Sequence, residues 1–210
     1  LYMLTEVCAI PNHPFNSNRL TQILQQSTMA ERDGFLQHFL YCYSGYDDDH
    51  FAHPIQRLID WADNGINKND VDNETIFLAS QTLAWCLPST FISLRDKASK
   101  SLVRLLENNT SVLLRILSTF KDIDDFYILE RLYAVAYGCT LRTKKKEDAI
   151  LVGQTVFDYI FKDAQPPAHI LLRDYARNTV EYAITQGLSV VHAAAPNRRT
   201  ARLPTRALTA

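Results

Sequence analysis

One short phrase recurs three times along the chain and limits what the chain can fold into. The copies begin at Leu94, Leu129 and Leu172 and read LRDKASKSLVRLL, LERLYAVAY and LRDYARNTV. Each places charged residues close behind a leucine and continues with an apolar stripe at helical spacing. The leucines lie 35 and 43 residues apart, and HEAT and armadillo units, which are built of paired helices, repeat every ~40–47 residues. The recurrence therefore predicts stacked helical hairpins.

Small residues within the phrase indicate how these hairpins would pack. An alanine stands four or five residues after each leucine (Ala98, Ala134 and Ala176). A further apolar residue stands eight residues after each leucine (Leu102, Tyr137 and Val180). A helix pair cannot bury its apolar face alone, whereas stacked pairs bury a continuous core. We expect the alanines to let neighbouring helices approach closely. We also expect Asp96 and Asp174 to accept hydrogen bonds from backbone groups or from the arginines.

Helical signals extend over most of the chain. Only 6 glycines occur in 210 residues, and no strongly alternating strand pattern is present. Thr28 and Glu31 have the spacing of a capping box, Pro54 suits the first turn of a helix, and Asp72 can cap the helix that follows it. Gly187 suits the end of a helix. The sequence predicts an all-α fold of about nine helices, paired as HEAT-like units of a right-handed superhelix, an α-solenoid.

The composition changes near the end of the chain. We expect residues 1–187 to form one helical repeat domain, with less regular helices over 1–64 and HEAT-like repeats over 72–187. Residues 188–210 contain no Asp or Glu and no aromatic residue but several arginines, alanines and prolines. This composition predicts a disordered basic tail. A nucleic-acid-binding arm and an out-of-frame extension are the alternatives for it.

The overall charge and the cysteines restrict the class of protein. The formal net charge is -1, so no global field attracts nucleic acid or an anionic membrane. No apolar run approaches the ~20 residues that a membrane-crossing helix needs. The four cysteines form no CxxC pair, which argues against a zinc framework and favours buried, reduced thiols. We therefore expect a cytoplasmic protein with no membrane partner and no role in nucleic-acid binding.

The catalytic motifs that can be recognised from sequence are missing. The chain contains no GxxxxGK[ST], GxGxxG, HExxH or GxSxG pattern, and we expect neither an enzyme nor a cofactor. A less favoured alternative, from a different class of protein, is a small metal-dependent enzyme that uses Asp47, Asp49, His50 and His53. Their spacing matches neither an EF-hand nor a facial triad, so a solvated acidic loop is favoured over a metal site.

A tyrosine stripe on one helix is the main candidate for a binding surface. Tyr127, Tyr133 and Tyr137 recur at helical spacing. Core packing is the ordinary interpretation of such a stripe, and a concave binding face is the sharper one, because solenoids bind extended partners there. From their position and chemistry, the candidate contact residues for a protein partner are Arg131, Tyr133, Tyr137, Arg173 and Arg177.

Several blocks of the sequence resemble, in the same order, parts of very large bacterial ATP-binding proteins. The blocks are MAERDGFLQHFLYCYS, HPIQRLIDWADN, LASQTLAWCLPSTFISLRDKASKSLVRLL, DDFYILERLYAVAYGCTLRT and HILLRDYARNTVEYAI. They are similar to the helical region of STAND-type NTPases of the antiviral-defence (Avs-like) kind. In that family a P-loop NTPase domain precedes helical repeats that resemble a sensor for a phage protein, and binding drives oligomerisation.

The resemblance covers roughly residues 1–187 and includes neither the NTPase nor the effector domain. It carries no catalytic residue onto this chain, because no matching motif is present. It implies a fragment of the helical sensor-like region, which agrees with a sequence that begins at Leu1 rather than Met. A free-standing helical scaffold with no nucleotide partner is the alternative.

Overall fold

The described residues form helices and turns without any strand. The computed structural model describes residues 1–42, 53–64, 70–163 and 165–189. Its helices are α1 (Tyr2–Glu6), α2 (Ser17–Gln26), α3 (Met29–Cys42), α4 (Pro54–Asp63), α5 (Asn73–Ala84), α6 (Ile92–Leu106), α7 (Thr110–Phe120), α8 (Phe126–Arg142), α9 (Lys146–Ile160) and α10 (Ile170–Thr185). These ten helices confirm the predicted all-α class and are one more than the sequence predicted. The predicted tail lies outside the described residues from position 190 onward.

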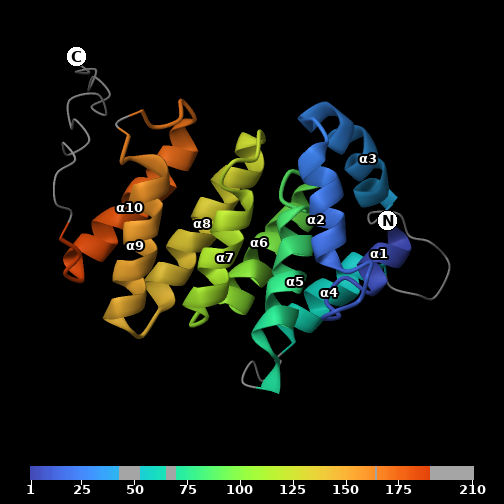
Figure 1. The fold of residues 1–210 in the computed structure, drawn as a ribbon, viewed down its shortest axis with the longest axis horizontal. Coiled ribbons are helices and arrows are strands. Elements are labelled where there is room, and N and C mark those ends of the chain that lie inside the picture. The colour runs from blue at the N-terminus through green and yellow to red at the C-terminus, as the bar shows by residue number, and fades with distance from the viewer. Residues whose placement is uncertain (43–52, 65–69, 164, 190–210) are drawn as a thin grey trace, which may run out of the picture.

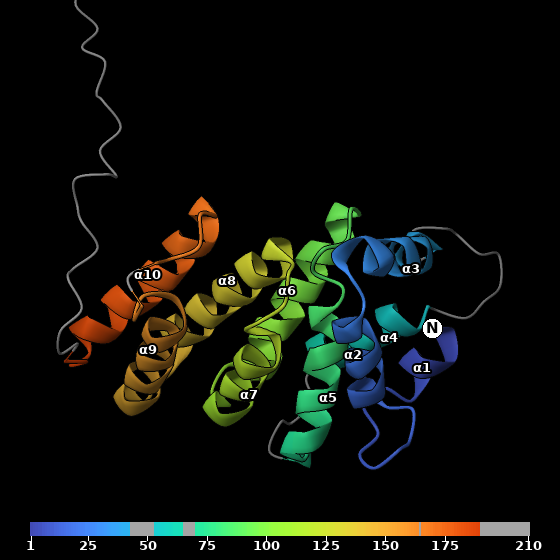
Figure 2. The ribbon, with the colours of Figure 1, turned by 45° about the horizontal axis from the view of Figure 1, so that its top comes forward.

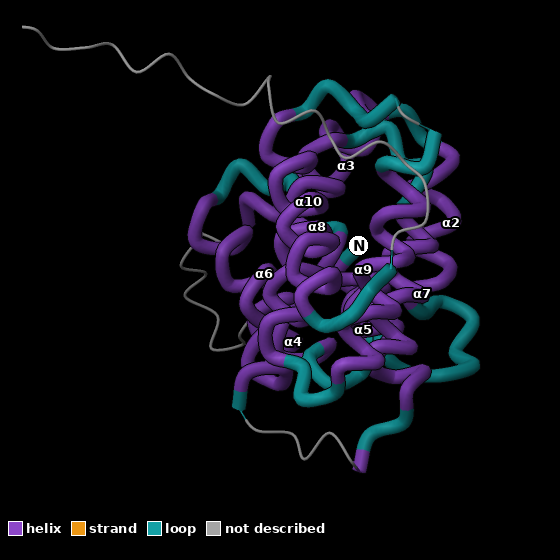
Figure 3. The backbone as a smooth tube through the Cα atoms, turned by 90° about the vertical axis from the view of Figure 1, so that its left-hand side faces the viewer, coloured by secondary structure: helices purple, strands orange, loops and turns teal. Residues whose placement is uncertain are grey.

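Two rows of helices make up most of the fold. In the first row α4, α6, α8 and α10 contact one another in that order, and in the second row α2, α5, α7 and α9 do the same. Figure 1 shows the helices side by side, and Figure 3 shows the two rows seen from one end. From α5 to α10, successive helices alternate between the rows. The apolar side chains between the rows form the core.

Local capping signals place most of the helix starts where the sequence predicts them. The Thr28 amide donates to Glu31 Oε2 at 2.8 Å and the Glu31 amide donates to Thr28 Oγ1 at 3.4 Å, which completes the capping box of α3. Asp72 accepts the Thr75 amide at 2.8 Å and caps α5. Gly187 has φ +114°, which favours glycine, and the Leu188 amide returns to the Ala183 carbonyl at 3.0 Å beyond the end of α10.

The predicted register of the recurring phrase was wrong for α8. Ala134 is half-buried, whereas Ala136, four residues after Leu132, is fully buried. The same buried pair of a leucine and an alanine four residues later occurs in every helix of the first row: Leu58 and Ala62, Leu94 and Ala98, Leu132 and Ala136, Leu172 and Ala176. Helix α8 begins six residues before Leu132, whereas α6 and α10 begin two residues before their leucines. The extra turn of α8 carries Leu129, whereas the residue of α8 that corresponds to Leu94 and Leu172 is Leu132.

One aromatic pair forms the centre of the core in the N-terminal half. The Trp85 and Phe120 rings pack with centroids 5.0 Å apart, and both side chains are buried. The indole nitrogen of Trp85 donates to Thr21 Oγ1 at 3.1 Å, which satisfies its polar atom. The pair therefore joins α2, the end of α5 and the end of α7. Trp61 of α4 packs against the core from a half-buried position.

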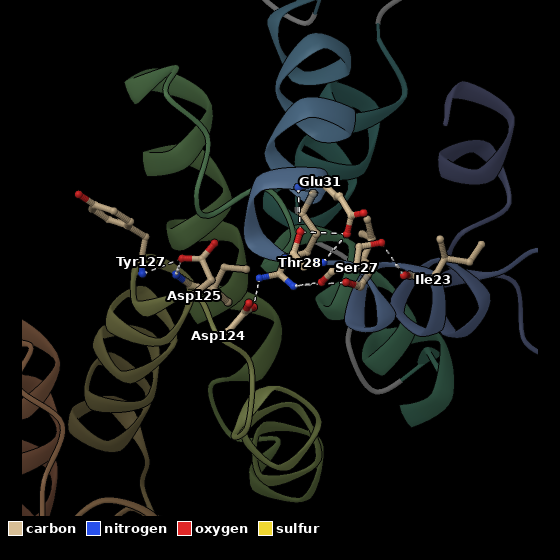
Figure 4. Close-up of polar contacts among 10 residues, drawn as sticks. Ile23, Ser27, Thr28, Glu31, Asp124, Asp125 and Tyr127 are labelled. Carbon is tan, nitrogen blue, oxygen red and sulfur yellow. Dashed lines mark hydrogen bonds and ion pairs between the residues drawn. The ribbon is translucent and has the colours of Figure 1, made fainter.

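Helix α3 belongs to neither row and runs across the ends of neighbouring helices (Figure 2). A buried arginine attaches it. Arg32 is 2% exposed, and its Nη1 donates to the carbonyls of Leu24 and Ser27 at 3.4 and 2.6 Å. Its Nη2 pairs with Asp124 in the turn between α7 and α8. Figure 4 shows Ser27, the C-cap of α2, and Asp124 on the two sides of this junction.

The Arg32 pair fixes two turns that are far apart in the sequence. The guanidinium hydrogen-bonds Asp124 and holds the pKa of that carboxyl below its usual range. Burying a guanidinium is costly unless its donors are matched, and here two carbonyls and a carboxylate match Nη1 and Nη2, whereas the buried Nε has no hydrogen-bond partner among the described residues. The arginine also lies 6.0 Å from the Trp85 ring, so the polar junction borders the aromatic core.

Replacing Arg32 should destabilise the protein far more than replacing its partner. We expect Arg32→Ala to lower the free energy of unfolding by about 3 kcal/mol, because it empties a buried site and leaves carbonyls without donors. Asp124 is 59% exposed, so we expect Asp124→Asn to cost about 1 kcal/mol or less. Urea unfolding followed by circular dichroism measures both, with the exposed Arg19→Ala as control. Equal losses of stability for the two variants would contradict the prediction that the buried guanidinium of Arg32 contributes more than its ion pair with Asp124.

Helices α9 and α10 pack closely at Gly153. A Cβ atom added at Gly153 would lie 2.2 Å from the Ala183 Cβ, so the two helices would have to separate. We expect Gly153→Ala to lower the free energy of unfolding by about 1–3 kcal/mol, the usual range for overpacking. Gly34 in α3 has nothing within 4 Å of an added Cβ, and Gly34→Ala should stabilise by about 0.5–1 kcal/mol through helix propensity. In thermal or urea unfolding, Gly153→Ala should lower the free energy of unfolding and Gly34→Ala should raise it.

Candidate interaction surface

Charged side chains connect successive helices of the first row. Between α4 and α6, Arg104 pairs with Asp63 at 3.0 Å. Between α6 and α8, Arg131 pairs with Asp96 at 3.5 Å and Arg142 with Glu107 at 3.9 Å. Between α8 and α10, His169 Nε2 lies 3.6 Å from Glu130 Oε2. These contacts cross from helix to helix, so many of the charges on this row already have partners within the fold.

The candidate residue Arg131 belongs to this set of paired charges. Its guanidinium lies between Asp96 of α6 and Glu130 of its own helix, with 3.8 Å between Arg131 Nε and Glu130 Oε1. Asp96 therefore receives an arginine, as the sequence predicts. A partner that engaged Arg131 would have to compete with these carboxylates, and the side chain serves mainly to join α6 to α8.

Tyr133 does not lie on a surface. It is 2% exposed, and burial raises the pKa of its phenol, with a smaller contribution from Tyr159. The prediction that Tyr133 contacts a partner was therefore wrong, because its side chain packs in the core. The tyrosine stripe is split by its surroundings, because Tyr137 is half-buried and Tyr127 is 66% exposed. Helical spacing alone does not show which member of such a stripe faces the core.

The two candidate arginines of α10 differ in their surroundings. Arg177 pairs with Asp174 at 2.9 Å and lies 3.9 Å from Glu181, so Asp174 also receives the arginine that the sequence predicts. Arg173 is half-buried on the first turn of α10 and has no carboxylate partner among the described residues. Of the candidate arginines, Arg173 is therefore the one at which a partner would meet the least competition from carboxylates of the described residues.

An exposed apolar cluster at the starts of α8 and α10 was missed by the sequence reasoning. Phe126 and Tyr127 begin α8, and Ile170 and Leu171 begin α10; their exposed fractions are 50%, 66%, 66% and 50%. The His169 ring lies between them, with centroids 5.9 Å from Phe126 and 6.4 Å from Tyr127. The sequence does contain a signal for this cluster: a bulky apolar residue directly follows each helix cap, at a position that does not belong to the buried apolar stripe of the helix.

Of the four residues proposed for a metal site, the structure describes His53. Asp47, Asp49 and His50 lie outside the described residues. His53 is the N-cap of α4: its Nδ1 accepts the Ile55 amide at 3.3 Å, and its ring packs against Phe39 with centroids 4.9 Å apart. Over the described part of the chain, no group of three or more His, Cys, Asp or Glu side chains is placed to hold a metal ion.

The cysteine thiols that the structure describes are buried in the core. Cys8, Cys86 and Cys139 are free and buried. Burial raises the pKa of Cys86 to about 12 and also raises the pKa of Cys8. Because the thiolate is the nucleophilic form, neither of these two thiols is disposed to act as a nucleophile near neutral pH.

Comparison with protein-family models, with curated proteins and with solved structures finds no match to this chain. Within the described residues, no helix has both the length and the apolar character needed to cross a membrane. The surface of the first row and the apolar cluster at its edge are thus the features from which function is inferred.

The cap of α4 should make stability depend on pH. Burial lowers the pKa of His53 below its ordinary value, Arg57 lowers it further, and Glu6 opposes them. The unfolded chain, with a histidine pKa of about 6.5, therefore binds the proton more readily. The contribution of His53 is present above that pH and is lost as the pH falls through the folded pKa.

We expect His53→Asn to reduce this loss, because asparagine keeps a capping oxygen but does not titrate. Urea midpoints measured from about pH 7.5 to about pH 5, the range in which histidine changes charge, should fall less steeply for the variant than for the parent protein. His38→Asn, on the exposed side of α3, controls for loss of an imidazole. Identical slopes for the parent and His53→Asn would refute the assignment.

Proposed function

We propose that this chain is an α-solenoid of helical hairpins that acts as a non-catalytic protein-recognition or scaffolding module. The observation that carries the proposal is the recurrent burial of a leucine and of an alanine four residues later in each helix of the first row. Together with the alternation of helices between two rows, this pattern suits repeat arrays, in which each unit contacts mainly its neighbours and the array presents an extended surface. The intervals of 36 to 40 residues between the four leucines lie close to those of helical-hairpin repeats.

We further propose that the module belongs to the helical region of a STAND-type NTPase of the antiviral-defence kind. The support is the ordered set of sequence blocks described above, which spans the helices from α3 to α10. In this proposal the partner is a phage protein or another domain of the parent NTPase, and the protein works in the cytoplasm. Binding would favour an oligomerising state of the parent protein by population shift, which requires the partner to bind that state more tightly than the resting one.

The outer surface of the first row is the proposed contact surface. Arg177 and Tyr137 remain on it as candidate contacts, and Arg131 contributes by holding α6 and α8 in their relative positions. The second row carries comparable charged residues, such as Arg115 of α7, which pairs with Glu74 of α5 at 2.7 Å. This pair supplies a matched control for surface substitutions.

A panel of individually purified phage proteins tests the proposed recognition. We expect at least one to co-elute with the chain in size-exclusion chromatography and to give a saturable calorimetric titration. Arg177→Ala should weaken that binding by about tenfold, the loss of one charged contact of about 1.4 kcal/mol. Arg115→Ala, on the other row, should leave it unchanged. A panel without any binder would remove the support for a phage sensor, and equal effects of the two variants would place the contact elsewhere.

The parent protein can be tested from the DNA on either side of the coding sequence. An in-frame upstream GxxxxGK[ST] motif, followed by continuous helical sequence into Leu1, is expected if the module belongs to an NTPase. A start codon immediately before Leu1, with no helical continuation in any frame, would favour a free-standing scaffold.

A further inference from the structure

The starts of α8 and α10 together form an exposed apolar surface. We call Phe126, Tyr127, His169, Ile170 and Leu171 the α8–α10 edge. Both helices begin at the same border of the first row (Figure 1). The ring contacts of His169 with Phe126 and Tyr127 make the cluster continuous. Single exposed apolar residues are ordinary on a protein surface, whereas a contiguous group of them marks an interaction site.

His169 is held in place from two sides, so the edge is preorganised. Its Nδ1 accepts the Leu172 amide at 3.4 Å and caps α10. Because Nδ1 is an acceptor, the neutral imidazole carries its proton on Nε2, which faces the buried Glu130 carboxylate at 3.6 Å. The ring is thereby held against the aromatic side chains of α8, and little ordering is required on binding.

The charged groups around the edge are mostly paired within the protein, and among the described residues one arginine is left without a carboxylate. The carboxylates there have partners within the protein: Asp124 pairs with Arg32, Asp125 accepts the amides of Tyr127 and Ile128, Glu130 faces Arg131 and His169, and Asp174 pairs with Arg177. Arg173, on the first turn of α10, has no carboxylate partner among the described residues.

We propose that the α8–α10 edge docks a segment of a partner protein in which bulky apolar side chains are flanked by Asp or Glu. The apolar side chains would cover Tyr127 and Ile170, and a carboxylate would pair with Arg173. This inference rests on the proposed recognition function and specifies its surface and the chemistry of its partner. Residues 190–210 of this chain are a poor match as occupant, because they contain several arginines and neither Asp nor Glu.

A displayed library of random peptides, selected on the full chain, tests the inference. We expect the enriched sequences to combine bulky apolar residues with Asp or Glu. A synthetic peptide of the enriched sequence should bind at least about tenfold more weakly to Ile170→Glu and to Arg173→Glu. Ile23→Glu, at an exposed apolar position on α2 in the other row, should bind it normally. Higher salt should weaken the binding, because part of it is electrostatic.

The outcomes separate this inference from the general proposal. Enrichment of basic peptides, or binding that Ile170→Glu leaves intact, would overturn the α8–α10 edge while leaving a recognition module in place. Light scattering that shows self-association of the parent chain, abolished by Ile170→Glu, would identify a second copy as the occupant and also overturn it. Failure of both the library and the phage-protein panel would count against both proposals. Circular dichroism of each variant confirms that it is folded.

Discussion

The buried guanidinium of Arg32 is the interaction on which the arrangement of the N-terminal half depends. It joins the turn between α2 and α3 to the turn between α7 and α8, and Arg32 and Asp124 are 92 residues apart in sequence. Helix α3 lies outside both rows, so these polar contacts add a fixed orientation to the apolar burial of Leu36 and Leu40. The same contacts fix Asp124, next to the cap that starts α8. The Arg32 junction therefore lies directly beside the start of α8, where the α8–α10 edge begins.

The features that could be predicted from the sequence are those that depend on local chemistry. The capping box of Thr28 and Glu31, the proline at the start of α4 and the Asp72 cap act within one turn, so their signals are complete in a short stretch. The all-α class follows from the sum of such signals. The register of α8 could not be found in this way, because leucines at 129 and 132 both fit a helical stripe and only packing against α6 and α10 distinguishes them.

The candidate site was harder to predict because a charged or aromatic residue on a helix has the same local signal in two different roles. Arg131 reads as a surface contact, but its charge is matched by Asp96 on the neighbouring helix. Tyr133 and Tyr127 belong to one stripe, yet the first is in the core and the second is exposed. Only the positions of neighbouring helices decide between these roles. Arg173 keeps its candidate status because no carboxylate in the described part of the chain matches its charge.

The packing of the first row explains why a binding surface would form at its edge. Ala98, Ala136 and Ala176 let α6, α8 and α10 lie close together, and their starts fall on one border of the row. Side chains just beyond the caps of α8 and α10 then project past the interfaces that the leucines and alanines occupy. They can be large and apolar without disturbing the core, since no neighbouring helix has to accommodate them. Substitutions at such exposed positions usually cost little folding stability, so the proposed contact residues can be replaced without disturbing the packing of the leucines and alanines.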